Sequence, residues 1–420
     1  MPRPRPRRAL PGRRRVERLA TELPQGVHDP AFLELLHRID QSPILPARRL
    51  EVFTDGNRAL VEMIEAIDRA GEEVLLQSYI FKDDSTGHAV VDALGKAVER
   101  GVRVRVLADA VGSVETREEF WQRLEKKRIA FRLFHPLRYP WLVLFRDHRK
   151  ILVVDRAVAF TGGMNIAEEY GSGLTRHRGS APLRSPAPRG ETTTWRDTHL
   201  RVEGPAAWEF AVVFRESWLS ADGPPFDLPS LAEPEAEWGA RCLVLDSRAG
   251  RGHRETALVL RAAVAAARQR IWITNAYFAP SWAALRTLCR ASRRGVDVRL
   301  MLPGKSDVPR LQNAARGSYA HLLRHGVRIF EYQPVVLHAK TLVIDGRFSV
   351  VGSSNLDFRS FSFNSECNLA VFDDDVAFRL EGAFQQDLAH AREIDRTAWE
   401  KRPLRQRLRE RFARWLSPLL

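Results

Sequence analysis

Two histidine–lysine pairs are the residues of this chain best suited to chemistry. Each pair opens a longer element, in which an aspartate follows five residues after the lysine and an asparagine ten residues later. The two copies are His148, Lys150, Asp155 and Asn165, and His338, Lys340, Asp345 and Asn355. Every residue of the second copy lies 190 positions after its counterpart. A lone histidine-x-lysine triplet arises by chance in a basic protein, but chance does not repeat the whole spacing.

The residues around each pair predict how the side chains are presented. Four aliphatic or β-branched residues follow each lysine, at 151–154 and 341–344, which is typical of a buried strand. On a strand, residues i and i+2 point to the same face, so each histidine projects beside its lysine. Two such edges facing each other would surround one point with two imidazoles and two ammonium groups. That set suits a phosphodiester, because cations hold its oxygens while one histidine attacks phosphorus and the other protonates the leaving alcohol.

The aspartates and the residues after them have less direct roles. Asp155 and Asp345 come where the strand turns into the next one, a position at which aspartate fixes a turn. We therefore interpret both chiefly as structural, although they belong to the catalytic element. The glycine-x-x-asparagine that follows returns an amide to the same edge and, in the second copy, the hydroxyl of Ser353.

The elements that must position these residues are also repeated. In each half a helix-like stretch ends in Arg-Gly-Val, and an alternating strand begins at Gly101 and at Gly295. Each is preceded by an apolar strand with an amide and a tyrosine, Gln77 with Tyr79 and Asn275 with Tyr277. These side chains could shape the pocket or simply pack. Strands alternating with helices predict an α/β domain in each half, with a sheet covered on its faces.

Length and composition divide the chain into five segments. At 420 residues, two domains are expected. The predicted organisation is a basic disordered tail at 1–20, a first half at 21–220, a proline-rich linker at 221–237, a second half at 238–400 and a basic amphipathic tail helix at 401–420.

The net charge of +14 lies almost entirely in the two tails. Residues 1–20 hold eight arginines and one glutamate, and residues 401–420 hold six arginines, one lysine and one glutamate, so the tails carry +13. The nearly neutral body argues against a nucleic-acid groove. Basic tails favour contact with an anionic surface, although solvated tails with no partner would have the same composition.

The cysteines and the apolar runs indicate the compartment. Cys242, Cys289 and Cys367 are far apart and form no pair with metal-like spacing, so we expect neither a disulfide framework nor a metal site, in a reducing compartment. No apolar run is long enough to cross a bilayer. The run at 140–145 before His148 could be a membrane-dipping rim of the site or an ordinary strand.

The C-terminal tail has the pattern of a membrane-surface helix. Apolar residues recur at helical spacing and arginines fill the other faces. A helix docked on its own domain would show the same pattern. The apolar positions are Leu404, Leu408, Phe412, Trp415 and Leu416.

Together these motifs resemble the phospholipase D superfamily, whose signature is HxKx4D followed by Gly-Ser/Gly-x-Asn. The segments Trp195–His199 and Gly352–Cys367 make the chain similar to the bacterial cardiolipin synthases, in particular the shorter type without N-terminal transmembrane helices. The resemblance implies two phospholipase-D-like α/β/α sandwich halves with mixed sheets, arranged as a pseudo-dimer. One departure is Gly163, where many members have serine.

The resemblance also implies the division of labour in the site. The reaction would be a two-step transfer through a phosphohistidine, with no metal or other cofactor. His148 would be the nucleophile and His338 the general acid and then base. Phosphate would be bound by Lys150, Lys340, Asn165, Asn355 and Ser353. Acidic residues would orient the histidines, Asp197 for His148 and Glu366 for His338.

The resulting hypothesis is a phosphatidyltransferase that joins two phosphatidylglycerols into cardiolipin and releases glycerol. It would be a peripheral protein at the cytoplasmic face of the bacterial cell membrane, with the anionic phospholipid surface as partner and no nucleic acid. The competing hypothesis is a phospholipase D-type hydrolase of lipids or, with less support, a nuclease. A lipid-binding scaffold with a dead site is disfavoured because neither motif has lost a residue.

Overall fold

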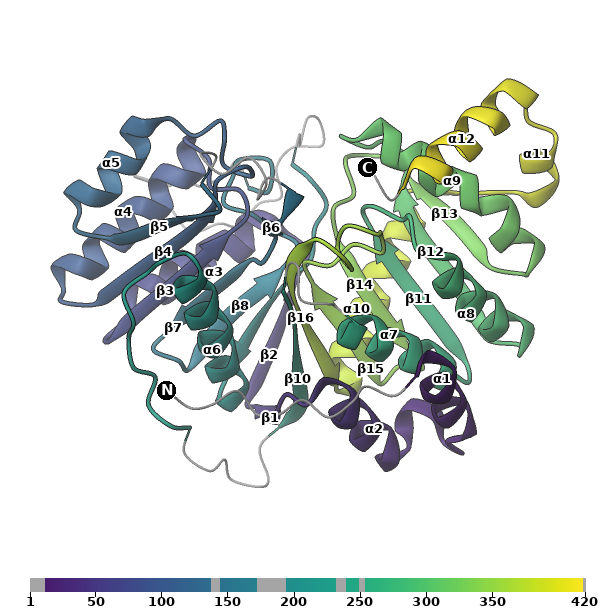
Figure 1. The fold of residues 1–420 in the computed structure, drawn as a ribbon, viewed down its shortest axis with the longest axis horizontal. Coiled ribbons are helices and arrows are strands. Elements are labelled where there is room, and N and C mark those ends of the chain that lie inside the picture. Colours follow the sequence, from purple (N-terminus) through teal and green to yellow (C-terminus); the bar gives the residue numbers. More distant parts are fainter. Residues whose placement is uncertain (1–11, 137–143, 172–193, 232–238, 249–253, 418–420) are drawn as a thin grey trace.

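The computed structural model describes residues 12–136, 144–171, 194–231, 239–248 and 254–417. Within these ranges the chain forms two mixed sheets that lie side by side, each belonging to one half of the molecule (Figure 1). The predicted α/β class is confirmed.

The sheet of the first half combines parallel and antiparallel strands. Its order is β2 (Arg49–Phe53), β9 (His199–Glu203), β8 (Val158–Gly162), β7 (Ile151–Val154), β3 (Glu73–Ser78), β4 (Arg103–Asp109) and β5 (Ala130–Phe134). The β3–β4–β5 pairs are parallel and the other pairs antiparallel. The helices of this half are α3 (Gly56–Asp68), α4 (Ser85–Glu99), α5 (Glu118–Lys126) and α6 (Pro205–Ser220).

The sheet of the second half repeats this topology and extends it. Its order is β1 (Ile44–Ala47), β10 (Ala240–Ser247), β16 (Asn364–Phe372), β15 (Phe348–Gly352), β14 (Lys340–Ile344), β11 (Arg270–Asn275), β12 (Asp297–Pro303), β13 (Arg328–Tyr332) and β17 (Ala391–Glu393), with β6 (Arg146–Asp147) paired to β16. The helices are α1 (Arg13–Glu22), the 3-10 turn η1 (Gly26–His28), α2 (Pro30–Asp40), α7 (Arg254–Ala266), α8 (Trp282–Arg293), α9 (Pro309–Arg324), α10 (Asp374–Leu388), α11 (Arg396–Glu400) and α12 (Leu404–Leu416).

Local sequence explains the repeated βα units. A glycine stands between each of the parallel strands β4 and β12 and the helix before it: Gly101 at φ +89°, after α4, and Gly295 at φ +91°, after α8. Only glycine adopts this backbone readily, so it ends the helix and starts the strand. These positions match the two Arg-Gly-Val signals of the sequence, and the predicted repeat is therefore present in three dimensions.

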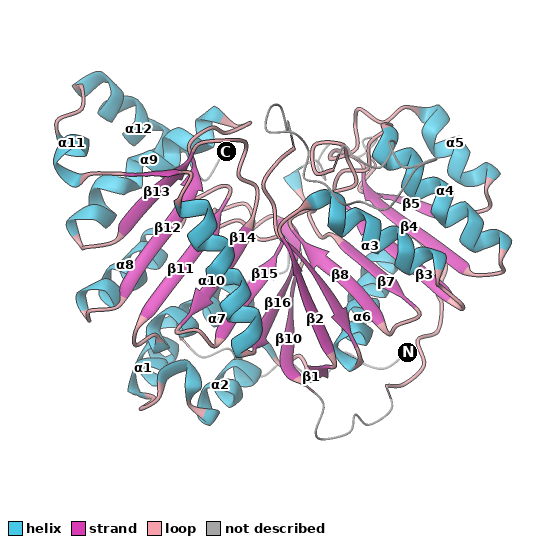
Figure 2. Ribbon diagram, turned by 180° about the vertical axis from the view of Figure 1, so that it is seen from behind, coloured by secondary structure: helices cyan, strands magenta, loops and turns pink. Residues whose placement is uncertain are grey.

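A shared apolar core holds the halves together. It contains residues of β3, β7, β8 and β9 from the first half and of β14, β15 and β16 from the second. Helix α6 contributes Phe210, Phe214 and Trp218, and α10 contributes Val376 and Leu380. Figure 1 shows α6 on the near face, and Figure 2, from behind, shows α10 on the opposite face. The two matching helices thus lie on opposite sides, as expected for halves related by a two-fold rotation.

The N-terminal segment differs from its prediction. Residues 12–20 were expected to belong to a disordered tail, but Arg13–Glu22 form α1, and Val16 and Ala20 are completely buried. Glu17 pairs with Arg261 and Arg290 of the second half. The expected first half, 21–220, is corrected too: α2 packs on α7 and β1 pairs with β10, so residues up to Ala47 belong to the second half. Strand pairing between distant segments leaves no mark in local composition.

The other expected boundaries lie partly outside the described residues. Of the linker 221–237, residues 223–231 form neither helix nor strand, and 232–237 are not described. Residues 1–11, 418–420 and most of the apolar run at 140–145 also lie outside the described ranges. Within those ranges, no helix is both long and apolar enough to cross a bilayer.

Candidate active site

His148 directly follows a strand of the first half that pairs with the sheet of the second half. Strand β6 runs parallel to β16, with Asp147 opposite Ser365. The backbone NH of His148 then donates to the Ser365 carbonyl at 2.8 Å. Glu366 is the next residue of β16, and its Oε2 lies 3.0 Å from Nδ1 of His148. The pairing of two backbones therefore fixes the imidazole against a carboxylate of the other half.

The same exchange occurs in the opposite direction. Arg196 of the first half pairs in parallel with Leu337, just before β14, and the NH of His338 donates to the Arg196 carbonyl at 2.8 Å. Asp197 follows Arg196, and its Oδ2 lies 2.7 Å from Nδ1 of His338. The two contacts are reciprocal, which is the relation expected between symmetric partners.

This crossing corrects the predicted acid partners. Asp197 was expected to orient His148 and Glu366 to orient His338, but each acid serves the histidine of the other half. The reason is the backbone exchange: the strand that receives each histidine is the one that carries the acid. The spacing of residues within one half does not indicate with which strand of the other half each histidine segment pairs.

The carboxylates are held by the residues that follow the motifs. Ser353 donates to Glu366 Oε2 at 2.5 Å and accepts from the Cys367 NH at 3.0 Å. Ser353 was expected to bind phosphate, and the structure instead makes it a positioning residue for Glu366. At the matching position, a Cβ on Gly163 would lie 2.1 Å from Asp197 Oδ1. The glycine that departs from the family pattern is therefore required by the closeness of Asp197.

The two lysines are buried beside the histidines. Lys150 is 2% exposed and donates to the His148 carbonyl at 2.7 Å. Lys340 is 3% exposed and its Nζ lies 2.9 Å from Nδ1 and 3.1 Å from Nε2 of His338. The prediction that each histidine and lysine share a face is confirmed. Because burial removes most of the water from both ammonium groups, an anion that binds them compensates for the solvation free energy that they have lost.

Burial and the neighbouring charges set the protonation of the site. Burial lowers the pKa of His148 to about 4 in spite of Glu366, and burial together with Lys340 lowers the pKa of His338. Burial lowers the pKa of Lys150 to about 7 and that of Lys340 to about 8. Each lysine also lowers the pKa of the histidine of the other half, so the four basic groups form one electrostatic cluster.

The acids remain ionised within this cluster. Burial alone would raise the pKa of Glu366, but His148 and Lys150 outweigh burial and the net pKa is lowered. The pKa of Asp197 is likewise lowered, because Lys340 and His338 outweigh its burial. Two carboxylates therefore face four groups that can carry positive charge, so one further negative charge, such as that of a phosphodiester, can be compensated there.

Both motif aspartates are structural. The carboxylate of Asp155 accepts the NH groups of Gly71, Glu72 and Glu73, each at 2.8 Å. That of Asp345 accepts the NH groups of 268–270 at 2.7–2.9 Å. They lie at φ +50° and +53°, in turns at the far end of the strands from the histidines. Their place in the catalytic set is therefore corrected in favour of the turn-forming role.

The motif asparagines brace the loops that flank the site. Asn165 Oδ1 accepts the Ile80 NH at 3.1 Å, and its Nδ2 donates to Tyr170 at 2.8 Å. Asn355 Oδ1 accepts the Tyr277 NH at 3.3 Å. The predicted contact of these amides with phosphate remains a prediction.

Aromatic rings enclose the histidines, and the sequence reading missed two of them. Tyr79 packs edge-on against His148, with ring centroids 4.8 Å apart, and Tyr277 lies 6.0 Å from His338. Tyr170 and Trp195 also pack on His338, at 5.5 and 5.2 Å. In the sequence, Trp195 contributes only to the family resemblance. Tyr170 stands five residues after Asn165, outside any motif that would indicate a place in the site.

The amides of the preceding strands also need a correction. Gln77 pairs with Ile151, whereas Asn275 pairs with Lys340, so the structural counterpart of Asn275 is Ser78. Gln77 donates to Asp147 Oδ2 at 2.5 Å, and Asn275 accepts the Leu356 NH at 2.9 Å. Gln77 thus holds the segment before His148, whereas Asn275 both holds the loop after the second motif and lines a cavity beside Lys340.

A possible ligand cluster exists away from the motifs. Cys289 of α8, His321 of α9 and His325, the residue that follows α9, place one ligand atom each within 4.8 Å of one another. The two histidines meet through their spacing of four residues at the end of α9, but Cys289 joins them only when α8 packs beside α9, so the sequence alone does not reveal the set of three. None of them belongs to the histidine–lysine elements.

Comparison with known proteins decides the family. A family model described as "Cardiolipin synthase, PLD-like domain" matches residues 63–171 and 260–388, once in each half. A cardiolipin synthase of Geobacillus is 32% identical over 95% of this chain and 78% of its own length. Cardiolipin synthase A of Pseudomonas fluorescens is 35% identical, over 93% and 79%. The chain belongs to the cardiolipin synthase family.

Solved structures place this cardiolipin synthase family member in the expected fold. Phosphatidylserine synthase from Haemophilus influenzae Rd KW20 aligns over 97% of this chain and 100% of its own, with a TM-score of 0.68 at 14% identity. Polyphosphate kinase from Porphyromonas gingivalis aligns over 89% and 54%, with a TM-score of 0.54 at 15% identity. The predicted membership of the phospholipase D superfamily is confirmed, and the chain is an enzyme of that superfamily.

Sulfate binding should depend on the two buried lysines. Sulfate stays a dianion across the range in which Lys150 and Lys340 lose their protons. Below about pH 7 both are charged and binding is strongest; as the pH rises through 7 and 8 the affinity should fall, by about tenfold per pH unit for each deprotonated lysine. Calorimetry in buffers of different ionisation enthalpy should show proton uptake on binding at about pH 8.5.

Matched variants identify the protons. Lys150→Met and Lys340→Met should each remove up to one proton of uptake, while the exposed Lys305→Met should leave it unchanged. An affinity that stays constant between about pH 6 and pH 9 would contradict the electrostatic description of the site.

Proposed function

We propose that this chain is a phosphatidyltransferase that joins two phosphatidylglycerol molecules into cardiolipin and releases glycerol. The observation that carries the proposal is the pair of crossed histidine–carboxylate contacts beside two buried lysines. The names of the relatives, which are cardiolipin synthases along nearly the whole chain, support the same activity.

The first step would transfer the phosphatidyl group to His148. Glu366 holds Nδ1 of this imidazole, so Nε2 is the atom left to attack phosphorus. The bond from phosphorus to the glycerol oxygen breaks, and His338 gives its proton to that oxygen from Nε2 while Asp197 holds Nδ1. A bound phosphodiester anion adds negative charge to the cationic cluster and favours the protonated His338 that this step needs.

The second step would reverse the proton transfer. His338, now neutral, accepts a proton from the hydroxyl of a second phosphatidylglycerol, and that oxygen attacks the phosphohistidine. The phosphorus–nitrogen bond breaks, cardiolipin forms and His148 is regenerated. Lys150 and Lys340 would stabilise the charge that builds on the non-bridging oxygens. Water in place of the second lipid would give phosphatidic acid, the product of the hydrolase alternative.

We further propose that the protein binds the cytoplasmic face of the membrane peripherally through α12. The helix packs on α9, with the Glu410 backbone close to Gly317. The side chain of Glu410 is 2% exposed and accepts hydrogen bonds of 2.7 and 3.0 Å from Arg402, in the turn before α12. Its apolar stripe points the other way, with Leu404, Leu408, Phe412 and Trp415 between 54% and 74% exposed.

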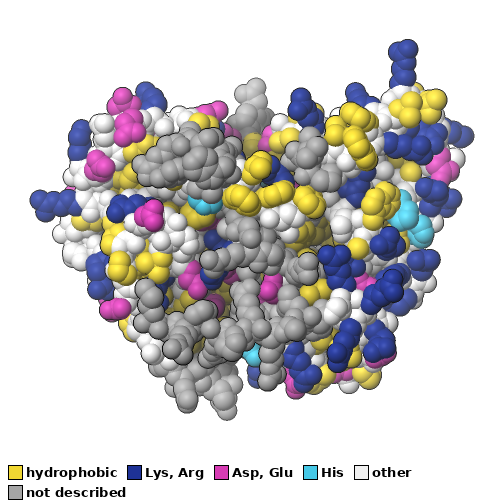
Figure 3. Space-filling view, in the orientation of Figure 1, with side chains coloured by type: hydrophobic (Ala, Val, Ile, Leu, Met, Phe, Trp, Pro, Cys, Tyr) yellow, Lys and Arg dark blue, Asp and Glu magenta, His cyan; other side chains and the backbone are white. Residues whose placement is uncertain are grey.

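The direction of the stripe favours the membrane over the alternative of simple domain packing. A helix that served only its own domain would bury the apolar face, not Glu410. The exposed Arg405, Arg407, Arg409 and Arg411 flank the stripe, and each would gain about 1 kcal/mol near an anionic surface. Figure 3 shows apolar side chains among Lys and Arg at the end of the molecule where Figure 1 places α12.

An activated lipid should separate the roles of the two histidines. Wild-type enzyme given phosphatidylglycerol vesicles should produce cardiolipin and glycerol in equal amounts. With phosphatidyl-p-nitrophenol, whose leaving group needs no proton, His338→Asn should release one burst of nitrophenol per site and retain the phosphatidyl group on His148. His148→Asn should give no burst. Mass spectrometry of peptides prepared at mildly alkaline pH, at which the phosphorus–nitrogen bond survives, locates the modified histidine.

Three other outcomes would change the proposal. A burst from His148→Asn with the label on His338 would reverse the assignment of nucleophile and acid. Phosphatidic acid as the main product of the wild type would establish the hydrolase. If either His148→Ala or His338→Ala keeps more than about a tenth of wild-type turnover with phosphatidylglycerol, a loss of only ~1.4 kcal/mol, the two motifs do not share one reaction.

The membrane role of α12 can be tested without disturbing its docking. Leu408→Ser together with Phe412→Ser removes two exposed apolar side chains and should weaken binding to phosphatidylglycerol vesicles at least about tenfold. Sedimentation with vesicles measures this. The melting temperature and the activity on detergent-dispersed lipid should not change. Phe378→Ser, at a position 74% exposed on α10, is the matched control. A lower melting temperature with activity lost in detergent as well would mean that the stripe is structural.

A further inference from the structure

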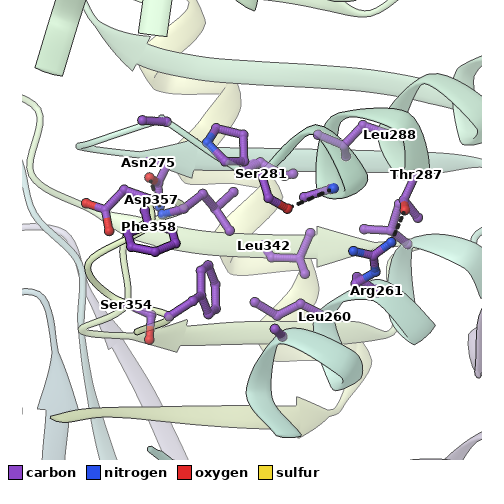
Figure 4. A pocket seen from close by; sticks show the side chains of 18 of the residues that line it. Leu260, Arg261, Asn275, Ser281, Thr287, Leu288, Leu342, Ser354, Asp357 and Phe358 are labelled. Carbon is purple, nitrogen blue, oxygen red and sulfur yellow. Dashed lines mark hydrogen bonds between the residues drawn. The ribbon is translucent and has the colours of Figure 1, made fainter. Parts of the chain in front are cut away.

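The second half contains an apolar cavity that begins at the active site. Its volume is about 600 Å³, within the range of small-molecule sites. The lining comes from β11, β14 and β15 below and from α7 and α8 around it, and includes Ile273, Leu342, Val350, Leu260 and Leu288. Figure 4 shows Asn275, Ser354 and Asp357 on one side, Arg261 and Thr287 on the other, and Leu342 and Leu260 between them.

Lys340 belongs to both the catalytic centre and the cavity. Its Nζ lies against the imidazole of His338, and the residue also lines the cavity wall. The strand period explains this continuity, because Lys340 and Leu342 lie on the same face of β14 and His338 comes two residues before Lys340. A phosphate held by Lys340 therefore has its ester groups at the opening of an apolar space.

The first half has filled the equivalent space. At matching positions, 190 residues earlier, Val350 is replaced by Phe160 and Ser354 by Met164. The register of the strands confirms the match, since Val350 pairs with Leu342 as Phe160 pairs with Leu152. Phe160 and Met164 are buried in the core cluster of the first half. The cavity thus exists because the second copy has smaller side chains than the first at these two positions.

The cavity also reaches the surface beside α12. Trp282 and Trp415 line it and are 53% and 74% exposed. Arg414, which lines it as well, donates to the Pro280 carbonyl and lies 5.6 Å from the centre of the Trp282 ring. The outward apolar stripe of α12 ends at Trp415, so the opening lies on the surface that we propose to contact the bilayer.

From these observations we infer that the cavity binds one acyl chain of a phospholipid whose phosphate lies at Lys340, and that the first half has no such site. This inference rests on the proposed function, which supplies a diacyl phosphodiester as the substrate. The site would make the enzyme sensitive to chain length on one of its two lipids. An empty apolar cavity of this size readily accepts an apolar ligand, because its lining lacks contacts on one side.

The test combines labelling with kinetics. Phosphatidylglycerol that carries a diazirine near the end of one acyl chain is photolysed with the His148→Ala enzyme, which cannot turn it over. The label should fall on peptides of α7, α8 and β15. Val350→Phe, which introduces the residue of the first half, should reduce this labelling at least tenfold. In the active enzyme it should lower kcat/KM for long-chain phosphatidylglycerol in detergent at least tenfold, and that for the dihexanoyl lipid less than twofold.

A second variant separates the loss of the acyl site from a folding defect of Val350→Phe. Leu260→Trp fills the cavity from α7, where the side chain is only partly buried, and should have the same effects with an unchanged melting temperature. Label spread over both halves, or a loss of activity with Leu260→Trp that is equal for long and short chains, would overturn the acyl site. If the wild type makes no cardiolipin but the labelling pattern holds, the proposed function fails and the acyl site stands.

Discussion

Two short backbone pairings between the halves hold the active site together. The NH of His148 bonds to a carbonyl of β16, and the NH of His338 bonds to a carbonyl just before Asp197, both at 2.8 Å. Each pairing takes a catalytic histidine out of its own half and sets it against an acid of the other. Arg149, between His148 and Lys150, reinforces the exchange with a buried ion pair to Asp246 of β10, in which Nε lies 2.8 Å from Oδ1. Neither half can supply a complete histidine–carboxylate pair alone.

The electrostatics of the site follow from this crossing. Two histidines and two lysines are buried around one point, and burial depresses the pKa of all four. The ionised Glu366 and Asp197 offset part of the free-energy cost of burying positive charge here, and an anionic substrate would offset the rest. The structure therefore favours binding of a phosphodiester before any chemistry takes place. Because of the same symmetry, the two histidines are nearly equivalent candidates for nucleophile and acid. Their roles can differ only through differences between the two copies, such as Ser353 in place of Gly163 and the apolar cavity of the second half.

Local sequence predicted the parts of the fold that depend on local physics. The strand period placed each histidine beside its lysine, the turn preference of aspartate gave Asp155 and Asp345 their structural role, and the glycine signals marked the βα units. Contacts between distant segments were beyond such reasoning. The acid partners were assigned within each half because spacing cannot report a strand exchange. Residues 21–47 were given to the wrong half because β1 finds its partner almost two hundred residues away. The stripe of α12 was visible in the sequence, but its outward direction depends on the burial of Glu410.

The crossed pairing is most directly tested by the nitrogen resonances of the two histidines. In protein labelled with ¹⁵N-histidine, His148 and His338 can be assigned among the twelve histidines by replacing each in turn. Glu366→Gln should shift the Nδ1 signal of His148 and lower its pKa further, because the carboxylate that opposes the effect of burial is gone, while His338 keeps its signal. Asp197→Asn should do the reverse. If Glu366→Gln perturbs His338 and spares His148, each acid serves its own half and the account of a crossed, shared site is wrong.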